Sequence, residues 1–153
     1  MDLVSFARDF CNDYQIPADK QVRLSFLALV PELMVTIDRK QMGYALRTLL
    51  DNAVNFSPRD GRIKMLVDRV GDEAELRVAD NGLGIPEDAK PYMFAPPVAN
   101  DDTIGLHWVK DITEAHGGSV RVTDNTPTGT VFFIMLPLDK NDDIPVEDAV
   151  MMD

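Results

Sequence analysis

The segment 80–86 reads DNGLGIP, and it limits the possible folds more than any other stretch of the chain. It follows residues 74–79 (AELRVA), whose alternation of apolar and polar side chains predicts a strand with one buried face. Asp80 at the end of this strand offers two acceptor oxygens, and Gly82 and Gly84 keep side chains away from a flat ligand near the backbone. Asp-Asn-Gly also marks ordinary turns. The segment alone therefore leaves two interpretations, a turn or a ligand-binding site.

Charge and composition restrict the class of partner. The 26 acidic residues outnumber the 15 basic residues and give a net charge of −11. Such a surface argues against nucleic acid and against direct contact with an anionic membrane. An anionic nucleotide stays possible, because helix N-termini and a bound cation can offset the repulsion. Cys11 is the lone cysteine, and no apolar run approaches the length of a membrane span. We therefore expect a cytoplasmic domain, which could still belong to a longer, membrane-anchored receptor.

Hydrophobic periodicity predicts one domain over residues 1–138, followed by an acidic tail or linker at 139–153. Asp38 is the expected N-cap of the longest helix, with Gln41 in the capping-box position. The loop 86–104 contains four prolines, and a loop of this length is usually functional or mobile. Helices that alternate with paired strands favour a two-layer α/β sandwich, in which a mixed sheet carries its helices on one face. The expected helices are 2–14, 38–56 and 105–116, and the expected strands are 22–29, 34–37, 62–69, 73–79, 119–123 and 130–138.

The helix 38–56 carries polar side chains on a second face beside its apolar stripe. Thr48, Asn52 and Asn55 are spaced i, i+4 and i+7, so they share this face. Asn52 also borders the apolar stripe through its spacing from Leu49 and Phe56. The residues alone leave two interpretations of Asn52, a hydrogen-bonded half-buried amide or part of a binding site.

Several segments in order resemble the ATP-binding catalytic domain of sensor histidine kinases, within the gyrase, Hsp90, histidine kinase and MutL superfamily. Residues 49–58 (LLDNAVNFSP) resemble the N box, and residues 80–86 resemble the G1 box. Residues 93–96 (MFAP) are similar to the F box, and residues 105–110 (GLHWVK) with 114–118 (EAHGG) are similar to the G2 box and its helix. Gly129 and Thr130 also fit. The resemblance covers nearly all of the chain up to Leu138 and implies a Bergerat-type ATP-binding fold.

The resemblance also implies roles for individual residues. Asp80 would accept the adenine amino group, in part through a water that Thr130 helps to hold. Asn52 would coordinate Mg²⁺ between the phosphates of ATP, a role that suits an amide oxygen. The helix that begins at Gly105 would direct its free N–H groups toward phosphate. Gly82 and Gly84 would let the base approach the backbone. Ile85, Phe94 and Leu106 would supply apolar contacts around the ring, and Asn55 would face the phosphates.

Some positions depart from the family pattern, and they concern the phosphates. Thr48 stands where the family usually has asparagine, and Asn55 stands where it usually has a lysine whose charge an amide cannot replace. The family's Gly-x-Gly-x-Gly is replaced by residues 101–105 (DDTIG), which keep only the last glycine. Base recognition is therefore expected to be intact, and phosphate binding is expected to be weakened or lost.

Three functional hypotheses follow from these features. The first is a catalytic domain that transfers the γ-phosphate of ATP to a histidine on a separate dimerisation or phosphotransfer domain, with a response regulator downstream. In that reaction the domain would position the reactants and neutralise charge, so we assign no catalytic residue. The second is a degenerate kinase-like domain that docks in a phosphorelay without binding ATP strongly. The third, an ATPase or serine kinase of the same superfamily, is disfavoured because Thr48 is a poor general base.

Overall fold

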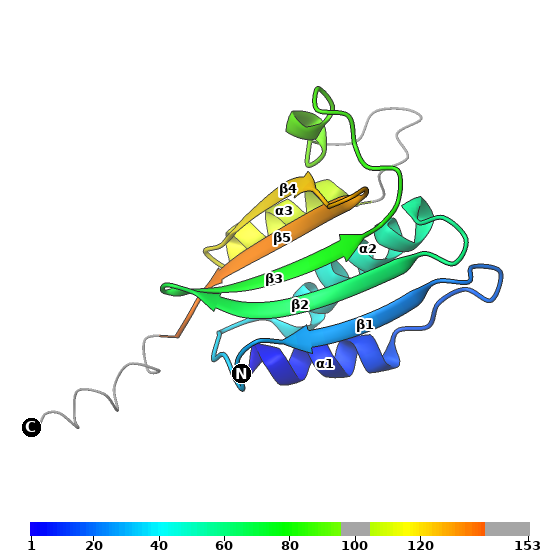
Figure 1. Ribbon diagram of the computed structural model, residues 1–153. Helices are drawn as coiled ribbons and strands as arrows, with labels where there is room; N and C mark the ends of the chain where they lie inside the picture. Colours follow the sequence, from blue (N-terminus) through cyan, green and yellow to red (C-terminus); the bar gives the residue numbers. More distant parts are fainter. Residues whose placement is uncertain (96–104, 140–153) are drawn as a thin grey trace, which may run out of the picture.

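The computed structural model describes residues 1–95 and 105–139, and they form a five-stranded mixed sheet (Figure 1). The strand order across the sheet is β1-β2-β3-β5-β4. β1 pairs with β2 in parallel, whereas the pairs β2–β3, β3–β5 and β4–β5 are antiparallel. The strands are β1 (Arg23–Ala28), β2 (Arg62–Val70), β3 (Glu73–Asp80), β4 (Ser119–Asp124) and β5 (Thr130–Pro137).

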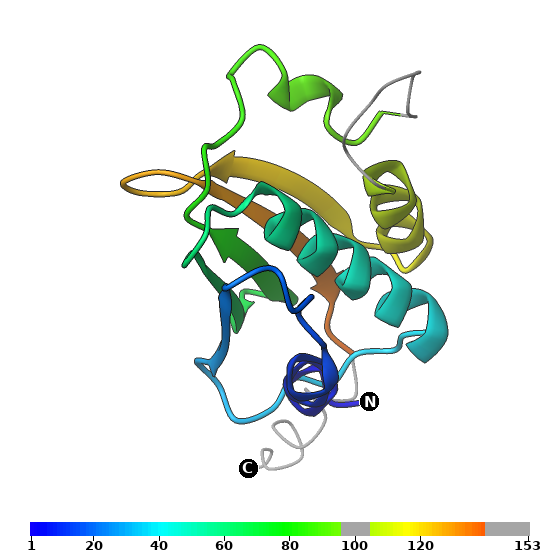
Figure 2. The same ribbon diagram turned by 90° about the vertical axis from the view of Figure 1, so that its right-hand side faces the viewer.

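Three α-helices cover one face of this sheet and leave the other face open, as Figures 1 and 2 show from two directions. α1 packs against β1 and β2, α2 lies against β3, and α3 contacts β4 and β5. The predicted two-layer α/β sandwich with a mixed sheet is therefore confirmed. The helices are α1 (Leu3–Asp13), α2 (Arg39–Phe56) and α3 (Leu106–Ala115), and a short 3₁₀ helix, η1, spans Lys90–Tyr92.

Local sequence signals account for the helix ends. The Asp38 carboxylate accepts the backbone N–H of Gln41 at 3.0 Å, as expected for the N-cap of α2. The Asp2 carboxylate caps α1 in the same way, accepting the N–H of Val4 at 3.1 Å. Gly117 follows α3 with a φ of +81°, the left-handed conformation in which glycine commonly ends a helix.

The core lies between the sheet and the helices. Alternate residues of β2, β3 and β5 point into it, and α2 contributes the apolar stripe that its periodicity predicted. This packing fixes the ends of β3 and α2 with respect to each other, and the candidate site is built from those two ends. The buried strand residues include Ile63, Met65, Val67, Leu76, Val78, Phe132, Ile134 and Leu136, and the stripe comprises Met42, Ala45, Leu46, Leu49, Leu50 and Ala53.

The prediction of a strand at 34–37 is wrong. Met34 forms one isolated bridge with Asp2, and the segment pairs with the N-terminus of the chain instead of joining the sheet. Val35 donates its N–H to the carbonyl of Met1 at 2.8 Å, and Leu3 donates to the carbonyl of Leu33 at 2.8 Å. Val35 is buried, Met34 and Ile37 are half-buried, and Thr36 is exposed, and this alternation explains the strand-like pattern.

Two predicted segments lie partly or wholly outside the described residues. Loop 86–104 is described as far as Ala95 and contains η1, and its remainder, with Asp101 and Asp102, lies outside. Of the predicted tail, only Asp139 is described. It donates its N–H to the carbonyl of Met34 at 2.8 Å and accepts the Thr36 hydroxyl at 2.7 Å. Among the helices of the described ranges, none combines the length and the apolar character needed to cross a membrane.

Candidate functional site

Asp80 ends β3 between two neighbouring strands and is almost completely buried, with 2% of its surface exposed. Its Oδ1 accepts the backbone N–H of Gly82 at 2.9 Å, and its carbonyl accepts the Nδ2 of Asn125 at 2.8 Å. Burial raises the pKa of the Asp80 carboxyl above its usual value, and hydrogen bonds from the backbones of Gly82 and Thr130 oppose part of this rise. Among the described residues, no Lys, Arg or His forms an ion pair with it. The fold therefore keeps a carboxylate in a buried position without a cationic partner.

Glycine is needed at position 82 because the backbone of α2 comes very close, and at position 84 because the backbone has a positive φ. A Cβ on Gly82 would collide with the carbonyl oxygen of Phe56, the last residue of α2. Gly84 adopts a φ of +86°, which L-residues rarely adopt. The turn at residues 81–84 therefore lies directly against the end of α2, as a shared N-box and G1-box site requires.

Asn52 lies on α2, one turn before that end, and its side chain is fully buried. Its Nδ2 donates to the carbonyl of Thr48 at 2.8 Å, within the helix. Because the amide nitrogen is directed along α2, the amide oxygen is the atom of this side chain that suits a cation. The Thr48 hydroxyl donates to the carbonyl of Tyr44 at 2.9 Å, so it is used inside the helix as well.

The first residues of α3 lie beside the same face of α2. Gly105 caps α3 with a φ of +69°, and a Cβ there would be 3.3 Å from Cγ2 of Thr48 and 3.4 Å from the Tyr44 hydroxyl. Leu106 is buried directly after it. The start of α3 is therefore placed next to Thr48 and Tyr44 of α2, and the role of Gly105 and Leu106 in a site stays a prediction.

Asn55 is exposed at the last turn of α2. With Phe56, Gly82, Gly84 and Thr128 it lines a cavity of about 610 Å³. This cavity joins the end of the N box to the G1 turn. It carries no cationic side chain among its described lining residues, which agrees with the loss of the family lysine at position 55.

The remaining predicted ring contacts lie on the loop after β3 and on β5. The Phe94 ring packs edge to face against the Phe132 ring, with 5.9 Å between the ring centroids. Ile85 is half-buried against the core. Thr130 is nearly buried at the start of β5. The structure thus joins Asp80 with Gly82, Gly105 with Thr48, and Phe94 with β5, whereas no described contact joins Phe94 to Asn52.

Two residues that support this arrangement were missed by the sequence analysis. Asn125 holds the carbonyl of Asp80, and its turn reaches β3 only through the pairing of β5 with β3. Lys90 donates from Nζ to the carbonyl of Ile85 at 3.0 Å and to the carboxylates of Glu87 and Asp124, each at 2.9 Å. Three acceptors match the three donors of an ammonium group. Asn125 meets Asp80 only when the sheet forms, so no local pattern points to it. Ile85 and Glu87 are close to Lys90 in the sequence, but its third partner, Asp124 on β4, becomes a neighbour only through the fold.

The fold and this site define a class of protein, and comparison with known proteins agrees. The profile of the family described as histidine kinase-, DNA gyrase B-, and HSP90-like ATPase matches residues 37–140. The chain belongs to this family, whose fold is the α/β sandwich described above.

Individual relatives are sensor histidine kinases. The alginate biosynthesis sensor protein KinB of Pseudomonas aeruginosa is 33% identical over 130 residues, which are 80% of this chain and 22% of KinB. The histidine-protein kinase/phosphatase MprB of Mycobacterium sp. is 36% identical over 112 residues, which are 65% of this chain and 22% of MprB. The chain therefore spans about a fifth of the length of either relative.

Solved structures give the same result. The catalytic domain of the histidine kinase ThkA superposes with a TM-score of 0.78 at 25% identity, over 90% of this chain and 94% of that domain. A structure of ThkA in complex with the response regulator protein TrrA superposes with a TM-score of 0.78 at 26% identity, over 91% of this chain and 41% of that one.

Proposed function

We propose that this domain binds ATP between the end of β3, the second half of α2 and the start of α3. The observation that carries the proposal is the buried carboxylate of Asp80, which has no cationic partner among the described residues. A buried carboxylate without such a partner costs folding free energy, so it is most readily explained by a ligand that donates hydrogen bonds to it. The exocyclic amino group of adenine is such a donor.

Each predicted site residue has a role in this proposal. Asp80 accepts the adenine amino group, and Thr130 helps to hold a water there. Gly82 and Gly84 let the base approach the backbone. Apolar contacts to the ring come from Ile85, Phe94 and Leu106.

The phosphates would lie toward α2 and α3. The free N–H groups at the N-terminus of α3, after Gly105, favour an anion. Asn52 would supply one oxygen ligand to Mg²⁺, which usually keeps several waters and binds phosphate oxygens as well. Asn55 would contribute an amide near the phosphates in place of a charge.

We further propose that the bound ATP supplies a phosphoryl group to a histidine on a separate helical dimerisation or phosphotransfer domain. The family and the sensor kinases it resembles support this assignment. The chain's own residues would orient the nucleotide and exclude water from the base, and the acceptor histidine would come from the partner. A response regulator is the proposed downstream partner, and the cytoplasm is the proposed location.

Calorimetry of the chain with ATP or ADP, with and without Mg²⁺, tests nucleotide binding. We expect binding that is abolished by Asp80→Asn, because an amide cannot accept in both of the carboxylate's positions. Asp9→Asn is the matched control, since Asp9 is exposed on α1, away from the site. Nucleotide binding that Asp80→Asn leaves unchanged would contradict the site.

A second candidate function is a docking module without strong ATP binding. It is favoured by the neutral, exposed Asn55 and by the Thr48 hydroxyl, which is bonded within α2. On this hypothesis the triple change Asn55→Lys, Asp101→Gly and Thr103→Gly creates nucleotide binding that the natural chain lacks. If the natural chain already binds ATP in the calorimeter, the docking hypothesis fails.

A further inference from the structure

A cavity of about 510 Å³ lies at one end of the open sheet face, on the side away from the helices. Residues of β1, β2, β3 and the β4–β5 turn line it. This volume lies within the range of small-molecule sites, about 300–1,000 Å³. The polar lining residues are Ser25, Arg62, Lys64, Asn81, Asn125, Thr126 and Thr128.

The charge of this cavity is opposite to that of the protein. Arg62 and Lys64 line it, and its described lining includes no Asp or Glu, in a chain with a net charge of −11. Within residues 1–95 and 105–139, neither cation forms an ion pair. Arg23 of β1 lies directly opposite Arg62 in the sheet register. Three cationic side chains therefore gather without carboxylates at one end of the sheet.

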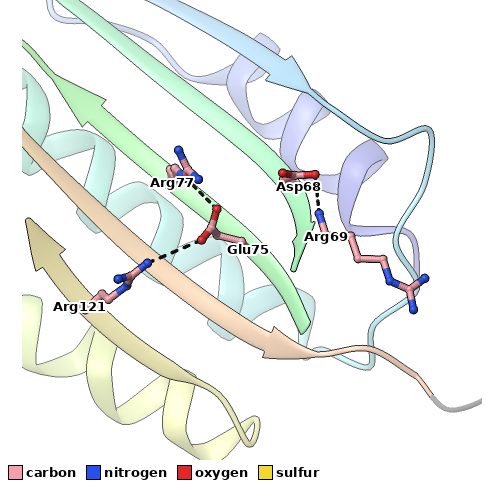
Figure 3. Close-up of polar contacts among 5 residues, drawn as sticks. All are labelled: Asp68, Arg69, Glu75, Arg77 and Arg121. Atoms are coloured by element: carbon pink, nitrogen blue, oxygen red, sulfur yellow. Dashed lines mark hydrogen bonds and ion pairs between the residues drawn. The ribbon is translucent and has the colours of Figure 1, made fainter. Parts of the chain in front are cut away.

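Another basic pair of the open face, Arg77 and Arg121, shares one carboxylate, as Figure 3 shows. The Glu75 carboxylate, only 3% exposed, lies 2.7 Å from Nε of Arg77 and 3.8 Å from an Nη of Arg121. Phe133 packs under both guanidinium groups, whose central carbons are 5.3 and 4.0 Å from the ring centroid. The same sheet face thus supplies a carboxylate for one pair of arginines and none for Arg62 and Lys64.

Protection of a sheet edge does not explain Arg62 and Lys64. Lysine on an edge strand discourages pairing with another chain, but β2 lies between β1 and β3. Like charges that lie opposite each other on neighbouring strands destabilise a sheet, and Arg23 and Arg62 have this arrangement. An anion bound between these cations would remove the repulsion.

The neutral groups of the cavity also suit an oxyanion. Asn81 uses its Oδ1 to accept the backbone N–H of Arg62 at 2.9 Å, so the other polar atom of this amide is a donor. Ser25 and Thr126 add hydroxyl groups. A guanidinium, an ammonium, an amide and hydroxyls together offer more donors than one carboxylate can use, and they match the several oxygens of a phosphate group.

We propose that this cavity binds a small phosphate-bearing anion, at a site separate from the proposed nucleotide site. The two sites meet at the G1 turn, because Asn81 and Thr128 line both this cavity and the 610 Å³ cavity of Gly82 and Gly84. The anion site does not depend on the proposed function, since it uses neither Asp80 nor Asn52.

The test is a titration of the ¹⁵N-labelled chain with inorganic phosphate, followed by amide NMR shifts, with NaCl at matched ionic strength as the reference. We expect saturable shifts at Ser25, Lys64, Asn81 and Thr126 that NaCl does not produce. The double variant Arg62→Gln with Lys64→Gln should weaken binding by at least about tenfold, whereas Lys64→Arg retains it. Glycerol phosphate as a second titrant tells whether the site takes a phosphate ester or only the free ion, and either result supports the phosphate chemistry.

Two controls keep the result specific. The double variant Arg39→Gln with Lys40→Gln removes the same two charges from exposed positions on α2, in the helical layer, and should leave phosphate binding unchanged. Asp80→Asn should also leave it unchanged, which separates this site from a failure of nucleotide binding. Shifts that do not saturate, binding that survives the double variant, or binding of citrate in preference to phosphate would each overturn the proposal.

Discussion

Replacement of Gly82 by alanine tests the contact on which the candidate site depends. The added Cβ would overlap the carbonyl oxygen of Phe56 and would lie 3.1 Å from Oδ1 of Asp80. Both contacts would be shorter than the roughly 3.5 Å at which non-bonded contacts become favourable. Phe56 ends the helix that carries Asn52, and Asp80 ends the central strand. The turn can therefore accept the methyl group only if the helix end and the strand end move apart.

The size of the effect follows from the cost of overpacking. A methyl group forced into a well-packed region costs about 1–3 kcal/mol. A loss of about 2 kcal/mol lowers the Tm of a domain of this size by about 4–8 °C. The same displacement separates Asp80 from Asn52, so any nucleotide affinity should fall by at least about tenfold.

Thermal unfolding followed by circular dichroism, together with calorimetry with ADP, measures both effects. Gly71→Ala is the matched control, because Gly71 has a φ of +60° at the β2–β3 turn and no atom within 4 Å of an added Cβ. That control should cost about 1 kcal/mol through backbone conformation alone and should leave binding unchanged. A Gly82→Ala variant as stable as Gly71→Ala, or one with natural nucleotide affinity, would refute the close contact between the G1 turn and α2.

Three further predictions concern single groups. Burial raises the pKa of the Asp80 carboxyl, so the stability linked to its protonated form is complete below its ordinary pKa of 3.8 and is lost as pH rises through the raised value. In urea unfolding between about pH 4 and pH 8, the natural chain should therefore lose stability relative to Asp80→Asn as pH rises. Parallel stability profiles of the two proteins would argue against a buried carboxylate. Asp38→Ala should cost about 1 kcal/mol in the same assay, because the backbone N–H of Gln41 loses its cap, and Asp38→Asn should recover most of it. Burial raises the pKa of the Cys11 thiol to about 11, so alkylation by iodoacetamide near pH 7 should be much slower in the native chain than in urea, and equal rates would show that the thiol is exposed.

Local signals predicted the parts of the fold that depend on neighbouring residues. The Asp38 cap, the α2 stripe and the glycine stop at Gly117 follow from capping, periodicity and left-handed backbone conformation. The segment 34–37 shows the limit of this approach. Its apolar residues are buried or half-buried, but whether they join the sheet or pair with the N-terminus depends on a partner more than thirty residues away.

The site shows the same division. Motif order predicted that Asp80, Asn52 and the start of α3 belong to one site; the family match covers all three segments, and their joint role stays a prediction. The roles of Lys90 and Asn125 depend on the register of β4, β5 and β3, which no pattern in the sequence specifies. Glu75 is a further example, because its position in the strand alternation predicts exposure on the open face, whereas the residue is 3% exposed and pairs with Arg77 and Arg121.

The parallel pairing of β1 with β2 has a consequence for how the molecule assembles. Parallel neighbours need a crossover, and here that crossover contains α2, the helix of Asn52. The docking of α2 and the pairing of β1 with β2 are thus two steps in forming one crossover connection. The helix itself docks on β3 and α3, whereas β1 pairs only with β2, so the helix and the first strand of this crossover are held by different parts of the fold.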